Sequence, residues 1–211
     1  MKVKKMAVLA MLAAMAFLLV CAVRIPVVLF LKYEPKDVVI TVGGFLFGPM
    51  AAMTVSFVVS LIEMVTVSDT GIIGCVMNLL STCAFACAAA WVYKKERTFR
   101  GAVVGLCLGA VIMTATMLLW NWLVTPLYMG VERQQIEALL LPAFLPFNLL
   151  KAGLNTALTL ALYKPLVTAL RKIGLLEQQE AKSSSKAGAY ILAAALLITC
   201  ILLLLALQGK L

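Results

Sequence analysis

Apolar runs long enough to cross a lipid bilayer as helices alternate along this chain with short clusters of basic residues. The first run covers residues 6–23 and is preceded by three lysines. Hydrophobic residues make up 64% of the sequence and charged residues only 13%, which excludes an ordinary soluble domain. The runs also lack the alternating pattern, about ten residues long, of barrel strands. The sequence therefore predicts an all-α, polytopic bundle of membrane helices in contact with the lipid bilayer.

The basic residues indicate how the chain is oriented in the membrane. Twelve of the 18 lysines and arginines form three clusters at the ends of apolar runs: Lys2, Lys4 and Lys5; Lys94, Lys95, Arg97 and Arg100; and Lys164, Arg171, Lys172, Lys182 and Lys186. Clusters in such positions mark the cytoplasmic side, so the net charge of +9 indicates a membrane topology and no nucleic-acid partner. We expect a multi-pass protein of the plasma membrane with a cytoplasmic N-terminus and with residues 32–37 on the outer side.

Three parts are expected along the chain. Residues 1–173 form a core of six membrane segments, at 6–23, 38–47, 50–67, 72–93, 101–123 and 142–170. Segment 38–47 is too short to span the membrane alone, so it must be buried in protein or line a cavity. Residues 124–141 form the long outer connection, with room for an amphipathic turn or helix. A polar cytoplasmic linker at 174–188 then leads to one additional transmembrane helix within 189–211.

Small residues on two helices predict close contacts with other helices. Ala10 and Ala14 lie one turn apart on the first helix, and Gly101, Gly105 and Gly109 repeat at four-residue spacing on a later one. Faces of this kind let helix backbones approach each other closely. The alanine face fits packing inside the bundle or docking on a separate subunit, and the residues alone leave both open.

Polar residues inside the apolar segments are few, and most lie on shared helix faces. Asn148, Lys151, Asn155 and Thr159 follow i, i+3, i+7, i+11 spacing. Two further helices carry similar stripes, which comprise Thr114, Asn121 and Thr125 on one and Gly74, Asn78 and Ser81 on the other. Three amide-bearing stripes predict one polar pocket in the outer half of the bundle.

The side chains of these stripes limit the kind of ligand. Asparagine both donates and accepts hydrogen bonds, which suits a neutral heterocycle or a polyol better than an ion. Aromatic residues near the stripes offer faces for ring stacking, namely Tyr33, Trp120, Trp122 and Phe147. Lys151 adds one charge for a carbonyl, hydroxyl or phosphate oxygen. The alternatives are interhelical hydrogen bonding for Asn78 and Asn155, and a snorkelling Lys151 or one paired with Glu63.

Other function classes find little support in the sequence. The chain has no histidine, and its six cysteines lie within apolar runs without a C-x-x-C pair, so we expect no metal site, no redox site and no bound cofactor. Paired intramembrane carboxylates are also missing, which disfavours an enzyme. No G-x-x-x-x-G-K-[ST] motif is present, so the chain does not hydrolyse ATP through a P-loop, and any energy that it needs must come from a partner or an ion gradient. Glu63 is the main intramembrane acid, which favours a partner.

Four stretches together carry a family resemblance. They are the Ala10-x-x-x-Ala14 face, Leu-Lys-Tyr-Glu-Pro-Lys-Asp at 31–37, Gly-Gly-Phe-Leu-Phe-Gly-Pro at 43–49, and Pro-Phe-Asn-Leu-Leu-Lys at 146–151. Over residues 4–173 the chain resembles the riboflavin-specific substrate-binding (S) component of bacterial energy-coupling factor (ECF) transporters. The segments at 31–37 and 146–151 are the specific parts of this resemblance, whereas the small-residue helix is generic to S components.

The resemblance implies a six-helix subunit that binds riboflavin or FMN from outside as a transported substrate. It also implies partners, namely a transmembrane coupling subunit and two cytoplasmic ATPase subunits, and a toppling motion that releases the vitamin inside. By motif position, the lid loop would contain Tyr33 and Asp37, the contacts to the flavin ring and ribityl chain would come from Asn78, Asn121, Asn148 and Lys151, and the coupling subunit would meet Ala10 and Ala14.

The chain departs from the family pattern in two places. Glu34 stands where the family often has aspartate, which keeps the carboxylate but changes its reach. The helix after Ala189 lies outside the six-helix pattern, and its role is open. The alternatives are an S component for another vitamin, or a stand-alone secondary carrier that works without partners.

Overall fold

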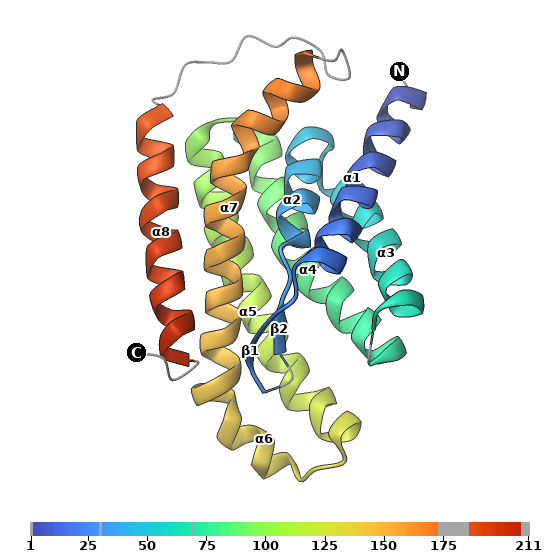
Figure 1. Cartoon of the computed structure of the whole chain (residues 1–211), viewed down its shortest axis with the longest axis vertical. Coiled ribbons are helices and arrows are strands. Elements are labelled where there is room, and N and C mark those ends of the chain that lie inside the picture. The colour runs from blue at the N-terminus through green and yellow to red at the C-terminus, as the bar shows by residue number, and fades with distance from the viewer. Residues whose placement is uncertain (1, 30, 69, 173–185, 208–211) are drawn as a thin grey trace.

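The computed structural model describes residues 2–29, 31–68, 70–172 and 186–207, and shows a bundle of helices with a small β-hairpin near one end (Figure 1). The all-α membrane class predicted from the apolar runs is confirmed. The elements in chain order are α1 (Lys2–Ala22), β1 (Ile25–Val28), β2 (Leu31–Tyr33), α2 (Lys36–Phe47), α3 (Pro49–Thr66), α4 (Gly71–Glu96), α5 (Phe99–Met129), α6 (Arg133–Leu139), the π-helical turn η1 (Leu140–Phe144), α7 (Leu145–Lys172) and α8 (Lys186–Leu207).

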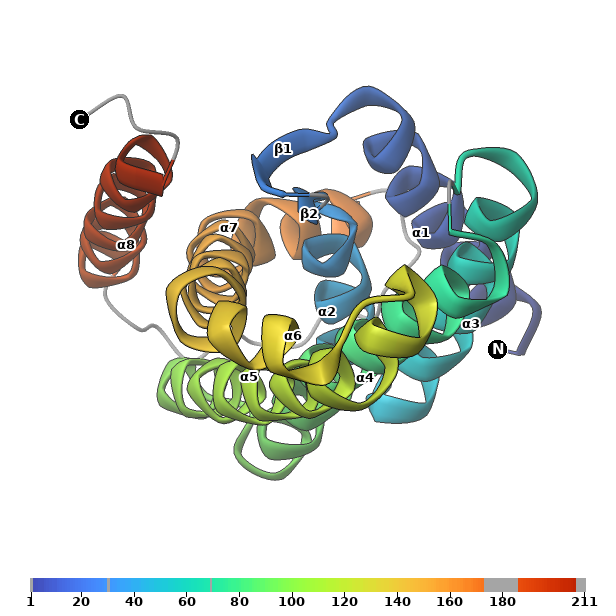
Figure 2. The same cartoon turned by 90° about the horizontal axis from the view of Figure 1, so that it is seen from below.

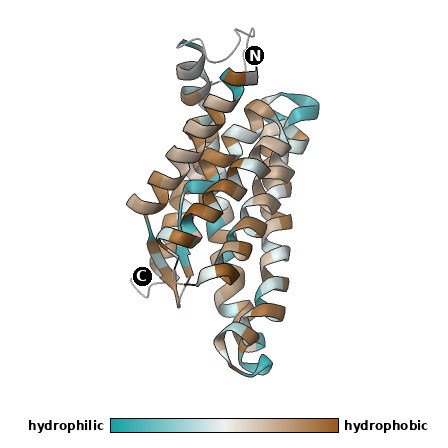
Figure 3. Ribbon diagram, turned by 90° about the vertical axis from the view of Figure 1, so that its right-hand side faces the viewer, coloured by the Kyte–Doolittle hydropathy of each residue, from teal (hydrophilic) through white to brown (hydrophobic). Residues whose placement is uncertain are grey.

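Within the described residues, five helical stretches are long and apolar enough to cross a membrane. They are Val3–Ala22, Pro49–Thr66, Gly71–Glu96, Phe99–Met129 and Arg133–Tyr163, and the shorter apolar stretch Tyr190–Ala206 belongs to α8. Apolar residues cover most of the length of the helices, whereas hydrophilic residues gather toward the two ends of the bundle and on the hairpin (Figure 3). This distribution matches a slab of hydrocarbon around the middle of the bundle.

The short helix α2 lies in the middle of the bundle. It is surrounded by α1, α3, α4 and α7 (Figure 2), and ten of its twelve residues are buried. At Gly44 a Cβ atom would lie 2.9 Å from the Cβ of Ala90, so α2 and α4 touch at close range. The prediction that this segment must be buried in protein is confirmed, because a helix of this length cannot place both its ends in water.

The hairpin corrects one expectation. Residues 32–37 were predicted to form a loop, but β1 pairs with β2 in an antiparallel ladder, and Lys36 and Asp37 already belong to the first turn of α2. The β-branched residues Ile25, Val27 and Val28 favour a strand. On β2 the side chains alternate, so that Leu31 and Tyr33 are buried while Lys32 is exposed.

The outer connection is also shorter than predicted. Residues 124–129 continue α5, which ends where Gly130 adopts a left-handed conformation (φ 65°) and donates its N–H to the carbonyl of Pro126. The rest of the predicted connection is mostly helical and consists of α6 and η1, so the amphipathic helix that was considered there is present. Pro126 lies in the last turn of α5, where it has no N–H to donate to the carbonyl of Trp122 one turn earlier.

The two ends of the bundle differ in content. The N-terminal end of α1, the turn between α4 and α5 and the C-terminal end of α7 lie at one end, called here the basic end (Figure 1). The hairpin and α6 lie toward the other end, called here the hairpin end. Lys94 and Lys95 in the last turn of α4, with Arg97 and Arg100 after it, carry much of the charge of the basic end.

Helix α8 packs along α7 and touches β1. Gly153 of α7 makes room for it, because a Cβ atom there would lie only 2.6 Å from the Sγ of Cys200. The predicted linker at 174–188 lies outside the described residues except for its last three, which already belong to α8. The division into core, linker and added helix therefore stays a prediction.

Candidate ligand-binding site

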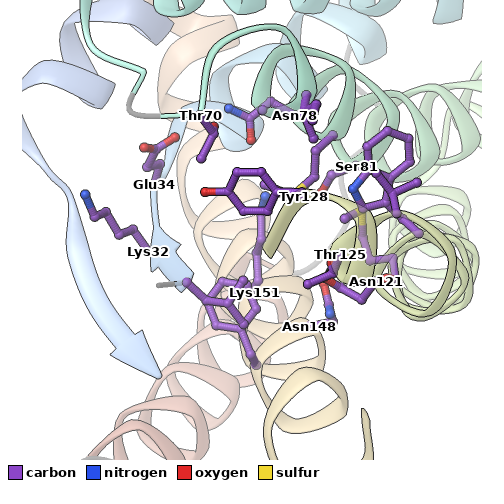
Figure 4. A pocket seen from close by; sticks show the side chains of 18 of the residues that line it. Lys32, Glu34, Thr70, Asn78, Ser81, Asn121, Thr125, Tyr128, Asn148 and Lys151 are labelled. Atoms are coloured by element: carbon purple, nitrogen blue, oxygen red, sulfur yellow. Dashed lines mark hydrogen bonds between the residues drawn. The ribbon is translucent and has the colours of Figure 1, made fainter. Parts of the chain in front are cut away.

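A pocket opens in the half of the bundle that carries the hairpin (Figure 4). Its walls come from β2, the turn between α3 and α4, and helices α4, α5 and α7. Because these elements are far apart in the sequence, only the tertiary fold creates the site. The labelled side chains that line it are Lys32, Glu34, Thr70, Asn78, Ser81, Asn121, Thr125, Tyr128, Asn148 and Lys151.

Four of the six substrate-binding residues predicted from the sequence lie in this one pocket. They are Asn78 of α4, Asn121 of α5, and Asn148 and Lys151 of α7. The three helical stripes thus meet in this pocket with part of their residues, whereas Thr114, Asn155 and Thr159 are not among its lining residues. Trp120 and Phe147 also line the pocket and add aromatic faces. Their roles toward a ligand stay predictions.

The aromatic residue Trp122 faces another way. Its Nε1 donates to Oε1 of Glu137 on α6 at 2.8 Å, and the guanidinium of Arg133 lies over the ring, 4.9 Å from the centroid. This cation–π contact and the hydrogen bond tie α6 to the outer end of α5. Trp122 is thus not among the residues that line the pocket, although its sequence position beside Asn121 suggested a stacking face.

Tyr33 and Asp37 lie behind the pocket wall and are not among its lining residues. Asp37 is fully buried, and its Oδ2 lies 3.3 Å from Nζ of Lys151 and 3.1 Å from Nδ2 of Asn155. Its other oxygen, Oδ1, accepts a hydrogen bond from Thr82 at 2.6 Å. The structure therefore pairs Lys151 with Asp37, and the considered pairing of Lys151 with Glu63 is wrong.

Tyr33 completes this cluster from the hairpin. Its hydroxyl donates to Oδ1 of Asn155 at 3.1 Å, so Asn155 bridges β2 and α2 through its two amide atoms. This bridge is the interhelical role that was the alternative for Asn155. Burial and the negative charge of Asp37 raise the pKa of Tyr33 well above its usual value, which keeps the phenol a donor. Tyr33 and Asp37 are placed to hold Lys151 and Asn155 in position.

A second buried ionic cluster lies beside the pocket. Nζ of Lys36 lies 2.6 and 2.5 Å from the two carboxylate oxygens of Glu63 and 3.2 Å from Oε2 of Glu34. Glu34 in turn accepts from Nε of Arg24 at 2.8 Å, and Nη1 of Arg24 donates to the carbonyl of Val67 at 2.9 Å. The cluster joins the hairpin, α2 and the end of α3 with alternating charges.

Sequence reasoning missed the parts played by Lys36, Glu34 and Arg24 in this cluster. The available signal was the near absence of other charges inside the core. A lysine at the start of one buried segment and a glutamate in the next must find partners, because an unpaired buried charge is very costly. The sequence could not show which charges meet, because Glu63 and Lys36 come together only when α2 enters the middle of the bundle.

Two pocket asparagines are anchored to the backbone one turn before them. Nδ2 of Asn121 donates to the carbonyl of Met117 at 2.7 Å, and its Oδ1 accepts from Thr125 at 2.9 Å. Nδ2 of Asn148 donates to the carbonyl of Phe144 at 2.8 Å. Lys151 donates to Oγ of Ser81 at 3.2 Å in addition to its contact with Asp37. Polar groups held in this way meet a ligand with little loss of side-chain entropy.

The predicted partner surface lies on α1. Ala10 and Ala14 are both exposed, while Val8, Leu12 and Ala16 of the same helix are buried in the core. The two alanines are therefore not packed inside the bundle, which was one of the two interpretations of the small-residue face. They form part of an open surface on one side of α1, and what covers it stays a prediction.

Comparisons with known proteins agree on one family. The family model described as "ECF transporter, substrate-specific component" matches residues 4–163, so α8 lies beyond the match. The riboflavin transporter FmnP of Bacillus subtilis (strain 168) is 28% identical over 163 residues, which cover 72% of this chain and 85% of that protein. The riboflavin transporter RibU of Staphylococcus aureus (strain TCH60) is 26% identical over 180 residues, with coverage of 81% and 94%.

A solved structure has a similar fold. The chain from "Structure and mechanism of the S component of a bacterial ECF transporter" superimposes with a TM-score of 0.70 at 25% sequence identity. The match covers 81% of this chain and 99% of that one. The similarity thus extends over nearly the whole of the solved chain.

Proposed function

The chain belongs to the family of substrate-specific components of ECF transporters, and on this premise we propose that it is the riboflavin-binding subunit of such a transporter. The observation that carries the proposal is the convergence of Asn78, Asn121, Asn148 and Lys151 in one pocket beside Trp120 and Phe147. Two relatives are named as riboflavin transporters, which supports the same substrate.

The pocket suits the chemistry of a flavin. Riboflavin joins a flat aromatic ring system, with an imide N–H and carbonyl oxygens along one edge, to a ribityl chain of hydroxyl groups. Aromatic side chains offer stacking faces for the ring. Asparagine amides and the Lys151 ammonium can meet the imide, carbonyl and hydroxyl groups. In this proposal Asn78, Asn121, Asn148 and Lys151 contact the vitamin, and Tyr33 and Asp37 act from behind by fixing Lys151 and Asn155.

The orientation follows from the distribution of charge. The protein is a multi-pass membrane protein, and its basic end carries the arginines and lysines that favour the cytoplasmic side. We place the N-terminus in the cytoplasm and the hairpin end outside, where riboflavin or FMN would enter the pocket. Residues 1–173 would form the binding core, 174–188 a cytoplasmic linker, and 189–211 an added membrane helix.

Transport would depend on partners, because the sequence has no P-loop to hydrolyse ATP. The relatives are transporters, which supports a transport subunit over an enzyme. The partners would be a transmembrane coupling subunit and two cytoplasmic ATPase subunits. In proteoliposomes with outward-facing protein, we expect riboflavin uptake only when these partners and internal ATP are present. Uptake by the chain alone would instead indicate a stand-alone carrier, and uptake of another vitamin would indicate a different substrate.

The exposed alanines of α1 give a prediction about the coupling subunit. Replacing both Ala10 and Ala14 with tryptophan should reduce co-purification with the coupling subunit by about tenfold or more, because bulky rings prevent close helix contact. Riboflavin binding by the isolated variant should equal that of the wild type. Val111→Trp, at a position of α5 that is 67% exposed, is the control and should keep the complex intact. A tryptophan pair on α1 that co-purifies normally would contradict this role.

A further inference from the structure

The contact between Asn78 and Glu63 determines the direction of one amide in the pocket. Glu63 is 2% exposed, and its Oε2 accepts a hydrogen bond from Nδ2 of Asn78 at 2.9 Å. Both carboxylate oxygens of Glu63 also lie within hydrogen-bond distance of Nζ of Lys36. Asn78 itself is half-buried and lines the pocket. Glu63 is not one of the pocket-lining residues, and Asn78 is the lining residue that it contacts directly.

The chemistry of the two side chains fixes which end of the amide faces Glu63. An ionised carboxylate only accepts hydrogen bonds, so the NH₂ group of Asn78 must face it and the carbonyl oxygen must face away. Figure 4 shows this arrangement, with the Asn78 oxygen directed toward the middle of the pocket and the nitrogen toward the side on which Thr70 and Glu34 lie. Among the described residues, Oδ1 of Asn78 has no hydrogen-bond partner in the protein.

We infer that Glu63 is a positioning residue that makes Asn78 present an acceptor to the ligand, so that this wall of the pocket selects an N–H or O–H donor. The inference rests on the proposed function. For a flavin, the donor is the imide N–H or a ribityl hydroxyl. A ligand that carries only acceptors at this position would leave Oδ1 of Asn78 unpaired in a partly dry site, which disfavours its binding.

Lys36 determines how the side chain of a Glu63→Gln variant is oriented. Its ammonium has donors only, so in a Glu63→Gln variant the oxygen of the new amide must face Lys36 and the NH₂ group of that amide must face Asn78. Asn78 then turns its oxygen toward position 63 and its NH₂ group toward the ligand. We expect the Kd of riboflavin to rise about tenfold, which is the typical effect of one lost hydrogen bond combined with an opposed donor pair.

The reciprocal exchange should restore binding. In the double variant E63Q/N78D, the new amide at position 63 donates through its NH₂ group to one oxygen of the new carboxylate at position 78. The other oxygen of that carboxylate accepts from the ligand, as the oxygen of Asn78 does in the wild type. Asn78→Asp alone places two carboxylates against each other and should weaken binding. We therefore expect both single variants to bind riboflavin about tenfold more weakly, and the double variant to come within about threefold of the wild type.

The measurement is fluorescence titration of detergent-purified protein with riboflavin and with analogues that each lack one donor, such as N3-methylriboflavin and deoxyribityl derivatives. One analogue will lack the donor group that binds Oδ1 of Asn78. For that analogue, Glu63→Gln should leave the Kd unchanged. The control is Glu137→Gln, which makes the same chemical change at an exposed glutamate on α6 and should leave every Kd unchanged.

Recovery in the double variant separates positioning from a merely structural role, because a structural defect of Glu63→Gln would persist there. The inference is overturned if the double variant raises the Kd of riboflavin by the product of the two single-variant factors. It is also overturned if Glu63→Gln binds riboflavin with wild-type affinity. If Glu63→Gln does not fold, Asn78→Ala replaces it as the test, because this variant keeps the Lys36–Glu63 pair. Equal riboflavin affinity of Asn78→Ala and the wild type would overturn the inference. Failure of the wild type to bind riboflavin would overturn the proposed function itself.

Discussion

Lys151→Met is expected to raise the Kd of riboflavin by about a hundredfold and to lower the free energy of unfolding by about 3–5 kcal/mol. Lys151 lines the pocket, and its ammonium lies 3.3 Å from Oδ2 of the fully buried Asp37. Methionine fills a similar volume but leaves Asp37 without its cation. An unpaired buried carboxylate is much more costly than the loss of a surface ion pair.

A second change separates the two effects of this variant. In Asp37→Asn combined with Lys151→Met, the orphaned charge is gone, so most of the lost stability should return while riboflavin binding stays weak. Thermal unfolding in detergent and riboflavin titration measure the two effects. Lys95→Met is the matched control, because Lys95 lies over the ring of Trp91 at the basic end, and it should change neither quantity. Normal affinity in the double variant would remove Lys151 from the proposed site.

Gly109→Leu is expected to destabilise the bundle by about 3 kcal/mol and to weaken riboflavin binding together with it. A Cβ atom at Gly109 would lie 2.5 Å from the carbonyl oxygen of Phe85, and one at Gly105 would lie 2.7 Å from that of Ala89. These obstacles are backbone atoms, which no side-chain rotation can move. Helices α4 and α5 must therefore separate. Asn78 belongs to α4 and Asn121 to α5, so the separation moves these two pocket residues apart.

The control for this prediction is Ala115→Leu on the same helix. Ala115 is exposed, so a larger apolar side chain there points to lipid and should leave the unfolding temperature unchanged. The readouts are the midpoint of thermal unfolding in detergent and the fraction of protein that binds riboflavin. If Gly109→Leu melts at the wild-type temperature, the close packing of α4 on α5 is not what holds the two walls of the pocket together.

Much of the fold follows from apolar length and spacing. The segments at 50–67 and 72–93 match α3 and α4 closely, because a membrane helix needs a continuous apolar run of known length. The converging stripes of Asn78, Asn121 and Asn148 were also predictable, because helical periodicity places polar residues on one face and buried polar groups seek each other.

The hairpin was not predictable in the same way. Strands of four and three residues are too short to show a periodicity, and the pairing of Ile25 with Tyr33 depends on where the chain meets α2 and α7. The ion pairs depend on the tertiary arrangement as well. Lys151 had more than one possible acidic partner in the sequence, and only the central position of α2 brings Asp37 to it instead of Glu63. Tyr33 and Asp37 consequently lie behind the pocket wall.

Riboflavin binding is tested most directly by titration of the detergent-purified chain with riboflavin while the flavin absorption and fluorescence are followed. We predict that the protein quenches riboflavin fluorescence in a saturable way at one equivalent, or is purified already yellow with bound flavin. Trp120 and Phe147 line the pocket and would contact the ring. A colourless protein that leaves riboflavin fluorescence unchanged would contradict the assignment of the pocket to riboflavin.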